Sequence, residues 1–311
     1  MRVVFMGSPL FAVPSLERLV LDGYGVVAVY TRPDRPAGRG RAVAAPPVKE
    51  VARRLGLVVV QPEGFKTAEA IAGLAAFRPD VIVVAAYGQM LPQPVLDVPG
   101  RGCLNVHASL LPRHRGAAPV AAAILAGDDF TGVSIMLVEK RLDAGPVLAR
   151  AAIPILPQDN AGSLTEKLAL VGADLLVEAL GGWVRGELVP RPQDEARATY
   201  FAQLTRGAGE IDWGLGVLEI WRRVRAFNPW PGSFTRWQGW QLKILEAVPV
   251  GGGADRPGRV VALDAGGAAF GVSAGDGVLG VRVVQLEGKK AMRADEFLRG
   301  QRGFIGAVLP C

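Results

Sequence analysis

The stretch RVVFMGSPLFAVPSLERLVLDGYGVVAVY, residues 2–30, decides the fold class, because it joins two expected strands through an amphipathic helix. RVVFM and VVAVY are short β-branched runs typical of buried strands, while the apolar residues of 11–21 recur at helical spacing. A strand, a helix and a second strand in this order form a unit whose two strands lie parallel. The stretch therefore predicts an α/β protein.

The same alternation continues to about residue 180. Further strands are expected at 57–60 (LVVV) and 81–86 (VIVVAA), and further helices at 48–55 and 67–77. Near the end, SLTEKLALVGADLLVEAL carries Ser163 and Glu166 in the spacing of a capping box, so we expect a helix to begin there. This repetition predicts a Rossmann-like parallel sheet with helices on both faces.

The character of the chain changes near residue 189. The stretch VPRPQDEARATY is rich in proline, arginine and acidic residues and is typical of a linker. After it come one helical stretch, 215–226, and short strands separated by glycine-rich turns, which indicate a small barrel or sandwich. We expect three parts, covering residues 1–189, 190–206 and 207–311.

Composition limits the class of protein. A chain of 311 residues exceeds the roughly 250–300 residues at which single cores stop growing, so two domains are expected. There is no charged-then-apolar leader and no apolar run of the roughly 18 residues that span a bilayer. Cys103 and Cys311 are the only cysteines, which disfavours a disulfide framework and predicts a cytoplasmic protein. The net charge of +6 fits either general solubility or a polyanionic partner.

Both histidines of the chain, His107 and His114, fall within NVHASLLPRHRG, residues 105–116. In an extended strand Asn105 and His107 share a face, about 6.5–7 Å apart, near the carboxyl edge where open α/β sheets bind ligands. An amide and an imidazole side by side suit the donation of hydrogen bonds to a developing negative charge. A histidine satisfied within the core fits this segment equally well.

Asp143, within RLDAGPVL, precedes a Gly-Pro turn. It is either a turn-forming aspartate or the carboxylate that orients His107. Sequence spacing alone does not bring the two residues together.

The stretch TRPDRPAGRGR, residues 31–41, holds four arginines, two prolines and two glycines. We expect neither helix nor strand there, but an exposed basic loop whose arginines contact phosphates; a merely solvated loop is the alternative. Gly7 stands without the further glycines of a dinucleotide fingerprint, which argues against a nicotinamide or flavin cofactor. Two histidines and two cysteines also disfavour a zinc site.

These segments together resemble the methionyl-tRNA formyltransferases, a family within the folate-dependent formyltransferases. The resemblance runs nearly end to end and rests on motifs in that family's order, among them GSPLFAVPSL, TRPDRPAGRG, VVAAYGQMLP, NVHASLLPRHRGAAPV, LDAGPVL and RAFNPWPGSF. The Asn-x-His motif with the aspartate is common to the whole superfamily. The PDRPAGRG and RAFNPWPG segments are more specific to the tRNA enzymes.

The resemblance implies transfer of the formyl group of 10-formyltetrahydrofolate to the α-amino group of methionine on initiator tRNA. It implies 1–189 as the catalytic domain, 207–311 as an OB-like tRNA-binding domain, a monomer, and no metal or redox cofactor. The implied residues are catalytic Asn105, His107 and Asp143; folate-binding Ser109, Leu110, Leu111, Pro112, Tyr87 and Gly88; and tRNA-binding Arg35, Arg39 and Arg41.

The chain departs from the family at His114, where tryptophan is usual, at Ala121 and Ala122, and at Arg141 and Gln203. Another formyltransferase acting on a nucleotide or nucleotide-sugar amine, a formyltetrahydrofolate hydrolase, and an RNA-binding protein on an inactive scaffold are the alternatives. The arginine loop and the barrel argue against the first, and the intact triad argues against the last.

Overall fold

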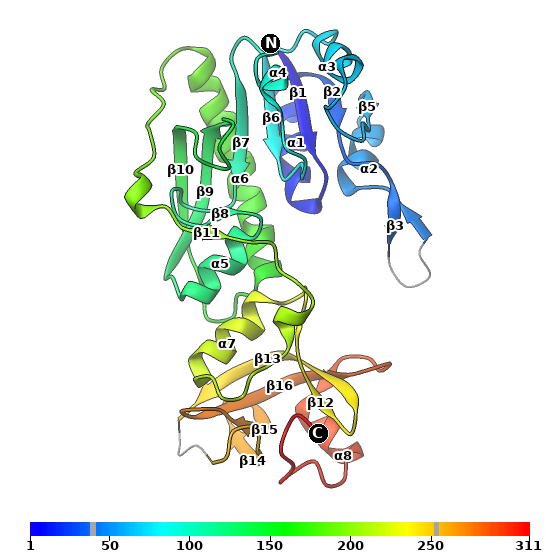
Figure 1. The fold of residues 1–311 in the computed structure, drawn as a ribbon, viewed down its shortest axis with the longest axis vertical. Coiled ribbons are helices and arrows are strands. Elements are labelled where there is room, and N and C mark those ends of the chain that lie inside the picture. The colour runs from blue at the N-terminus through cyan, green and yellow to red at the C-terminus, as the bar shows by residue number, and fades with distance from the viewer. Residues whose placement is uncertain (38–41, 252–254) are drawn as a thin grey trace. The chain divides into compact units, whose positions relative to one another are not determined.

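The computed structural model describes residues 1–37, 42–251 and 255–311 (Figure 1). The chain forms two compact units, each assembled from several stretches. Unit 1 comprises Met1–Pro119, Phe130–Pro154 and Thr165–Phe201, and unit 2 comprises Val120–Asp129, Ile155–Leu164 and Ala202–Cys311. Unit 1 thus includes most of the expected linker, and the division at 189 and 206 stays a prediction.

A seven-stranded sheet forms the centre of unit 1, in the order β10-β9-β7-β6-β1-β2-β5. Its strands are β1 (Arg2–Gly7), β2 (Gly25–Tyr30), β5 (Val59–Val60), β6 (Val81–Ala85), β7 (Cys103–His107), β9 (Phe130–Leu137) and β10 (Val147–Pro154). The five strands from β7 to β5 are parallel, which confirms the Rossmann-like core. β9 and β10 add to it antiparallel, so the whole sheet is mixed.

The strand order reverses between β1 and β6. From β1 the chain proceeds to β2 and β5 on one side, whereas β6 and β7 lie on the other. Gly7 at the end of β1 allows close packing here, because a Cβ would lie 2.8 Å from the Ala12 side chain and 3.0 Å from the Ala85 carbonyl oxygen. Ligands of open α/β sheets bind at such a reversal, beyond the carboxyl ends of the strands.

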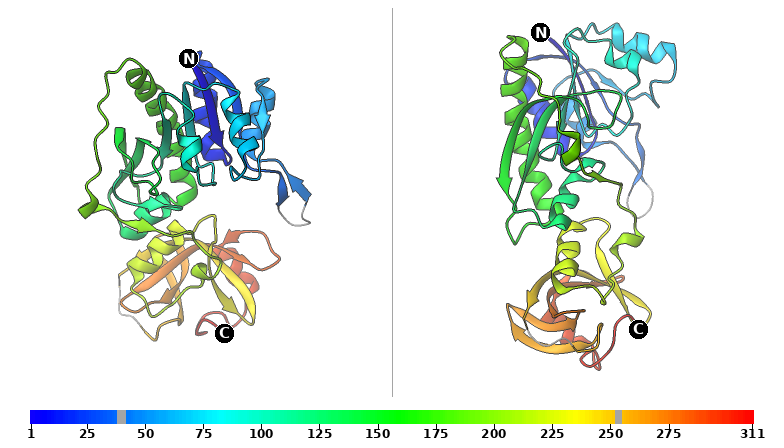
Figure 2. Two further views of the ribbon diagram at one scale, coloured as in Figure 1. Left: turned by 45° about the horizontal axis from the view of Figure 1, so that its top comes forward. Right: turned by 60° about the vertical axis from the view of Figure 1, so that its left-hand side comes forward.

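Helices cover both faces of this sheet, as expected. They are η1 (Leu10–Ala12), α1 (Val13–Leu21), α2 (Pro47–Arg54), α3 (Ala68–Ala75), α4 (Gln93–Leu96) and α6 (Ala161–Val184). Met6 and Cys103 share a buried cluster with residues of α3 and α4. Gly172 of α6 instead lies against Val106, which points to the opposite face of β7. Figure 2 shows α6 running alongside the green strands of the sheet.

Helix α6 begins two residues before the predicted start. The Asn160 side-chain oxygen accepts from the Ser163 amide at 2.9 Å, and the Ser163 hydroxyl accepts from the Asn160 amide at 3.1 Å. Asn160 is therefore the cap and Ser163 its reciprocal partner. The prediction that paired Ser163 with Glu166 was wrong because asparagine caps as well as serine does.

The basic loop also differs from expectation, because β3 (Arg35–Ala37) and β4 (Ala42–Ala44) pair antiparallel on either side of residues 38–41. The prediction that no strand forms there was wrong. Proline has no backbone N–H and is therefore tolerated on edge strands. Both strands of a two-stranded ribbon are edges, so Pro36 is compatible with β3.

Unit 2 contains an antiparallel sheet in the order β12-β13-β16-β15-β14, with β17 paired to β16. Its strands are β12 (Ser233–Trp237), β13 (Trp240–Val250), β14 (Val260–Ala265), β15 (Ala268–Ser273), β16 (Val278–Leu286) and β17 (Met292–Arg293). Phe304 lies at the centre of the core, its ring 4.9–5.0 Å from those of Trp237, Phe270 and Phe297. The antiparallel domain is confirmed; the described strands pair in an open order, and closure into an OB-like barrel stays a prediction.

The remaining elements are short. They are β8 (Arg115–Gly116), α5 (Pro119–Ala126), η2 (Glu195–Arg197), β11 (Tyr200–Phe201), η3 (Gly207–Gly209), α7 (Val217–Ala226) and α8 (Ala294–Gly300).

Candidate active site

Asn105 and His107 lie on one face of β7, as the alternation predicts. β7 is an inner strand between β6 and β9, and its last residue, His107, pairs with Ser134 of β9. His107 is only 6% exposed, while Asn105 is half-buried. Both side chains are therefore fixed by a buried strand at the carboxyl edge of the parallel core.

Two acceptor groups flank the imidazole of His107. Its Nε2 lies 3.0 Å from the carbonyl oxygen of His114, and its Nδ1 lies 3.7 Å from Oδ2 of Asp143. Only the imidazolium form of histidine donates from both ring nitrogens. The fold thus brings Asp143 to His107, a meeting that the sequence left open.

The backbone around these partners adopts an uncommon conformation. Asp143 and His114 have φ angles of 49° and 58°, in the left-handed region that residues other than glycine rarely occupy. The Gly116 amide donates to Oδ2 of Asp143 at 2.8 Å. Conformations of this kind persist where surrounding contacts hold them, and they gather at functional sites.

Arg115 is part of the site and was not predicted from the sequence. Its side chain is fully buried, and its guanidinium donates to Gln193 at 2.9 Å, Glu195 at 2.8 Å and Tyr200 at 2.7 Å. β8 also pairs in parallel with β11, so Gly116 lies beside Phe201. The stretch that was expected to be a linker therefore completes the surroundings of His107. Its only signal in the sequence was the run of amide and acidic residues at 193–195, which supplies acceptors for a buried arginine.

Glu195 links two arginines at the surface of this cluster. Hydrogen bonds from Arg115 and Arg141 lower the pKa of its carboxyl to about 2. A carboxyl whose pKa is depressed on folding stabilises the protein above its ordinary pKa of about 4.3, and this contribution is lost as the pH falls toward the folded value.

We therefore expect Glu195→Gln to lower the thermal midpoint by a few degrees at pH 7, and by progressively less from pH 5 toward pH 2. Glu187→Gln is the matched control, because Glu187 pairs with one exposed arginine, Arg185, within the part of the chain that the structure describes, and should show a smaller effect. Melting curves across this range measure the difference, and a deficit independent of pH would contradict the ion-pair explanation.

Two of the four expected folate-binding residues of the 109–112 loop are engaged by the protein itself. The Ser109 hydroxyl donates to the carbonyl oxygen of Arg113 at 2.6 Å, and Leu111 is 1% exposed. Leu110 and Pro112 are half-buried. A cavity of about 670 Å³ adjoins the loop, lined by Leu110, Leu111, Pro112, Arg113, Arg150, Ala196, Arg197, Ala198 and Thr199.

Tyr87 and Gly88, also expected to contact folate, lie beyond the end of β6. The Tyr87 ring is 1% exposed and packs 6.4 Å from Phe65, and burial raises the pKa of its hydroxyl. The carbonyl oxygen of Gly88 accepts from the Arg32 guanidinium. A ligand contact from Tyr87 would therefore use its backbone.

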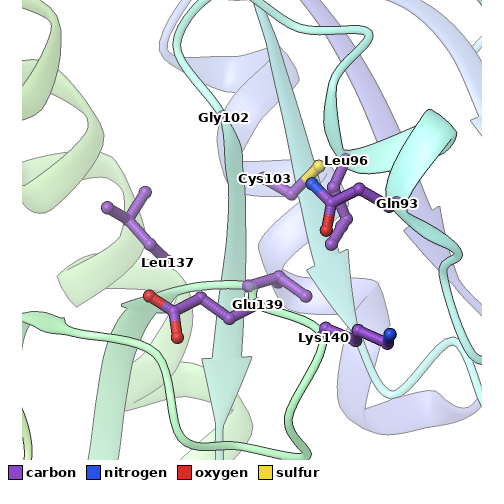
Figure 3. A pocket seen from close by; sticks show the side chains of 8 residues that line it. Gln93, Leu96, Gly102, Cys103, Leu137, Glu139 and Lys140 are labelled. Carbon is purple, nitrogen blue, oxygen red and sulfur yellow. The ribbon is translucent and has the colours of Figure 1, made fainter.

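A cavity of about 430 Å³ opens beside the start of β7 (Figure 3). It is lined by Gln93, Leu96, Gly102, Cys103, Leu137, Val138, Glu139 and Lys140. Cys103 belongs to the same face of β7 as Asn105 and His107, and the loop that carries Glu139 and Lys140 leads on to Asp143. Burial raises the pKa of the Cys103 thiol to about 12, so it carries almost no nucleophilic thiolate at neutral pH.

Of the expected tRNA-binding arginines, Arg35 is exposed at the start of β3, and Arg39 and Arg41 lie outside the described residues. Asp34, just before β3, is fixed in place. Its carboxylate accepts from the Gln61 amide and from the Lys49 ammonium, and these bonds lower its pKa.

Within the described residues, no group of three or more histidine, cysteine or acidic side chains is placed to hold a metal ion. The same part of the chain contains no helix long and apolar enough to cross a membrane.

Comparison with known sequences assigns this combination of fold and site to a family. Residues 1–180 match the formyl transferase family, and residues 203–302 match the formyl transferase C-terminal domain. The chain belongs to the formyl transferase family. It is 51% identical to the methionyl-tRNA formyltransferase of Dehalococcoides mccartyi over 99% of this chain and 98% of the relative. It is 50% identical to the methionyl-tRNA formyltransferase of a Roseiflexus species, over 97% of this chain and 93% of the relative.

Solved structures show the same fold at lower identity. HypX of Aquifex aeolicus in complex with tetrahydrofolic acid has a TM-score of 0.62 at 20% identity, over 99% of this chain and 48% of HypX. The sugar 3N-formyl transferase WlaRD, solved in the presence of dTDP and 5-N-formyl-THF, has a TM-score of 0.66 at 16% identity. The match covers 93% of this chain and 99% of WlaRD.

Proposed function

We propose that this chain transfers the formyl group of 10-formyltetrahydrofolate to the α-amino group of methionine on initiator methionyl-tRNA. The proposal rests on the approach of His107 to Asp143, at 3.7 Å, on the strand that also carries Asn105. It rests also on the identity of about half between this chain and methionyl-tRNA formyltransferases over nearly the full length. The product is N-formylmethionyl-tRNA for translation initiation. A cytoplasmic monomer fits this role.

The residues divide the chemistry between them. The amine attacks the formyl carbon, and Asn105 and His107 donate to the oxyanion that develops; one such donor is worth about 2.7–4 kcal/mol. Asp143 takes the proton that the amine loses, directly or through water, and holds the imidazolium. The bond from the formyl carbon to N10 of the folate then breaks, and N10 takes the proton back from Asp143, directly or through water, which restores the carboxylate.

His107 must change partners for this role. Its Nε2 lies against the carbonyl oxygen of His114 at 3.0 Å. Donation from that nitrogen to the oxyanion requires the substrate oxygen to take the place of the carbonyl. Asp143 on the other side of the ring keeps the imidazolium paired during the exchange.

The cavity beside Cys103 is the proposed site of the folate ring. Its volume of about 430 Å³ lies within the range of small-molecule sites, and it combines apolar walls with the polar side chains of Gln93, Glu139 and Lys140. Alternate residues of a strand lie about 7 Å apart on one face, so Cys103, Asn105 and His107 form a row from the cavity to the catalytic histidine. Contacts from the 109–112 loop and from the backbone of Tyr87 and Gly88 remain part of the proposal.

We expect Gln93→Trp to raise the half-saturating folate concentration about tenfold, because the indole occupies the cavity, and to leave that for tRNA within about twofold. Gln93 is exposed on α4, so the fold tolerates the change. Gln158→Trp, at an exposed position in a turn, is the control. Initial rates against folate concentration measure the effect, and equal folate saturation in the two variants would remove this cavity from the folate site.

The basic loop, residues 31–41, is the proposed contact with tRNA, through Arg35, Arg39 and Arg41. Arginine suits phosphate recognition, and the net charge of +6 favours association with a polyanion. Affinity for tRNA should therefore fall steeply as salt rises.

The test is single-turnover formyl transfer from 10-formyltetrahydrofolate to methionyl initiator tRNA. Methionyl elongator tRNA, a nucleotide-sugar amine and a reaction without acceptor run beside it. Transfer to initiator tRNA well above the other arms supports the proposal. Transfer to the sugar amine, or release of formate without transfer, would replace it with one of the two alternative activities.

A further inference from the structure

We propose that Gln193 is a positioning residue that fixes Asp143 against His107, an inference that rests on the catalytic roles proposed above. Gln193 falls in the interval between the two family matches, residues 1–180 and 203–302. It is half-buried, in the stretch that the sequence marked as a linker.

The amide of Gln193 joins the buried guanidinium to the aspartate loop. Its Oε1 accepts from Nε and Nη2 of Arg115 at 3.1 and 2.9 Å. Its Nε2 donates to the carbonyl oxygens of Asp143 and Gly145 at 2.8 and 2.7 Å. The single side chain of Gln193 therefore joins the Arg115 guanidinium to the loop that carries Asp143.

The orientation of this amide is determined by its neighbours. Arginine only donates, and carbonyl oxygens only accept, so the amide oxygen must face Arg115 and the amide nitrogen must face the loop. A glutamate would keep the bonds to Arg115 but would present an oxygen to two carbonyl oxygens.

These bonds act on the conformation of Asp143. The residue has a φ of 49°, and holding its carbonyl oxygen fixes the direction in which the carboxylate leaves the backbone. Oδ2 is held in turn by the amide of Gly116, the neighbour of Arg115. Asp143 is thus held at its backbone carbonyl oxygen by Gln193 and at its carboxylate by Gly116, and both of these partners are joined to Arg115.

The same segment also holds the other neighbour of His107. The Thr199 hydroxyl accepts from the His114 amide at 2.8 Å, and the Thr199 carbonyl oxygen accepts from the Arg115 amide at 2.8 Å. The stretch from Gln193 to Thr199 therefore sets both groups that flank the imidazole.

The first test compares Gln193→Glu and Gln193→Ala with the wild-type chain, and uses the exposed Gln158→Ala as control. We expect both Gln193 variants to lower the saturated single-turnover rate about 10- to 100-fold, because a small misplacement of a catalytic group costs this much. Half-saturating concentrations should stay within about twofold, and Gln193→Glu should keep a near-normal thermal midpoint through its contact with Arg115. A near-normal rate in Gln193→Glu would overturn the proposal, because a merely structural amide needs only that contact.

The second test repeats Gln193→Ala in an Asp143→Ala background. Because Gln193 acts through Asp143, the added loss should be less than about twofold; a full, multiplicative loss would overturn the proposal. Failure of the wild-type chain to formylate initiator tRNA would instead count against the proposed function, and the same variants are then compared by formate release from 10-formyltetrahydrofolate.

Discussion

We expect His107→Ala to lower the single-turnover rate of formyl transfer about 10²–10³-fold and to leave the affinity for methionyl-tRNA within about twofold. The imidazole lies 3.7 Å from the Asp143 carboxylate, and the proposed mechanism makes it a donor to the oxyanion. Its loss would remove this donor and the imidazole that flanks the Asp143 carboxylate. Rapid quench of the reaction and tRNA binding in separate titrations give the two quantities.

A matched substitution separates the donor from the charge. His107→Gln keeps an N–H at the end of the side chain but cannot become a cation. We expect its rate to lie between those of wild type and His107→Ala. A rate in His107→Ala close to that of wild type would show that the oxyanion is stabilised elsewhere.

The parallel core could be predicted from the sequence because its signals are local. RVVFM, VVAVY and VIVVAA are dense in β-branched residues, and the structure places them in β1, β2 and β6. β9 and β10 were not predicted as strands. β9 pairs with β7, a partner distant along the chain, and β10 pairs with β9, which precedes it directly. The edge strand β5 is only two residues long, shorter than the run LVVV suggested.

The candidate site divides in the same way. Asn105 and His107 share a face because of strand alternation, which the sequence contains. Asp143 reaches His107 only through the turn between β9 and β10, whose geometry the sequence does not contain. Arg115 and Gln193 were missed for a further reason. The amide and acidic residues of 193–195 were the only signal, and in a proline-rich stretch they indicated an exposed linker and not the acceptors of a buried arginine.

A second large effect is expected from Gly116→Ala. Gly116 has a φ of 107°, and a Cβ there would lie 2.4 Å from the carbonyl oxygen of Phe201. Backbone atoms cannot move aside as a flexible side chain can, so the substitution combines conformational strain with separation of β8 from β11. We expect the free energy of unfolding to fall by about 3 kcal/mol or more.

Gly186→Ala provides the matched control, because Gly186 also has a positive φ, of 73°, but a Cβ there would meet no atom of the described residues within 4 Å. It should cost about 1 kcal/mol, from backbone conformation alone. Only Gly116→Ala should also lower the transfer rate, by more than tenfold, because the Gly116 amide holds Oδ2 of Asp143. Urea unfolding and single-turnover kinetics of both variants make the comparison. Equal stability losses at the two positions would mean that strain, and not the approach of Phe201, sets the requirement for glycine. A normal rate in a folded Gly116→Ala protein would mean that Asp143 keeps its place without this amide.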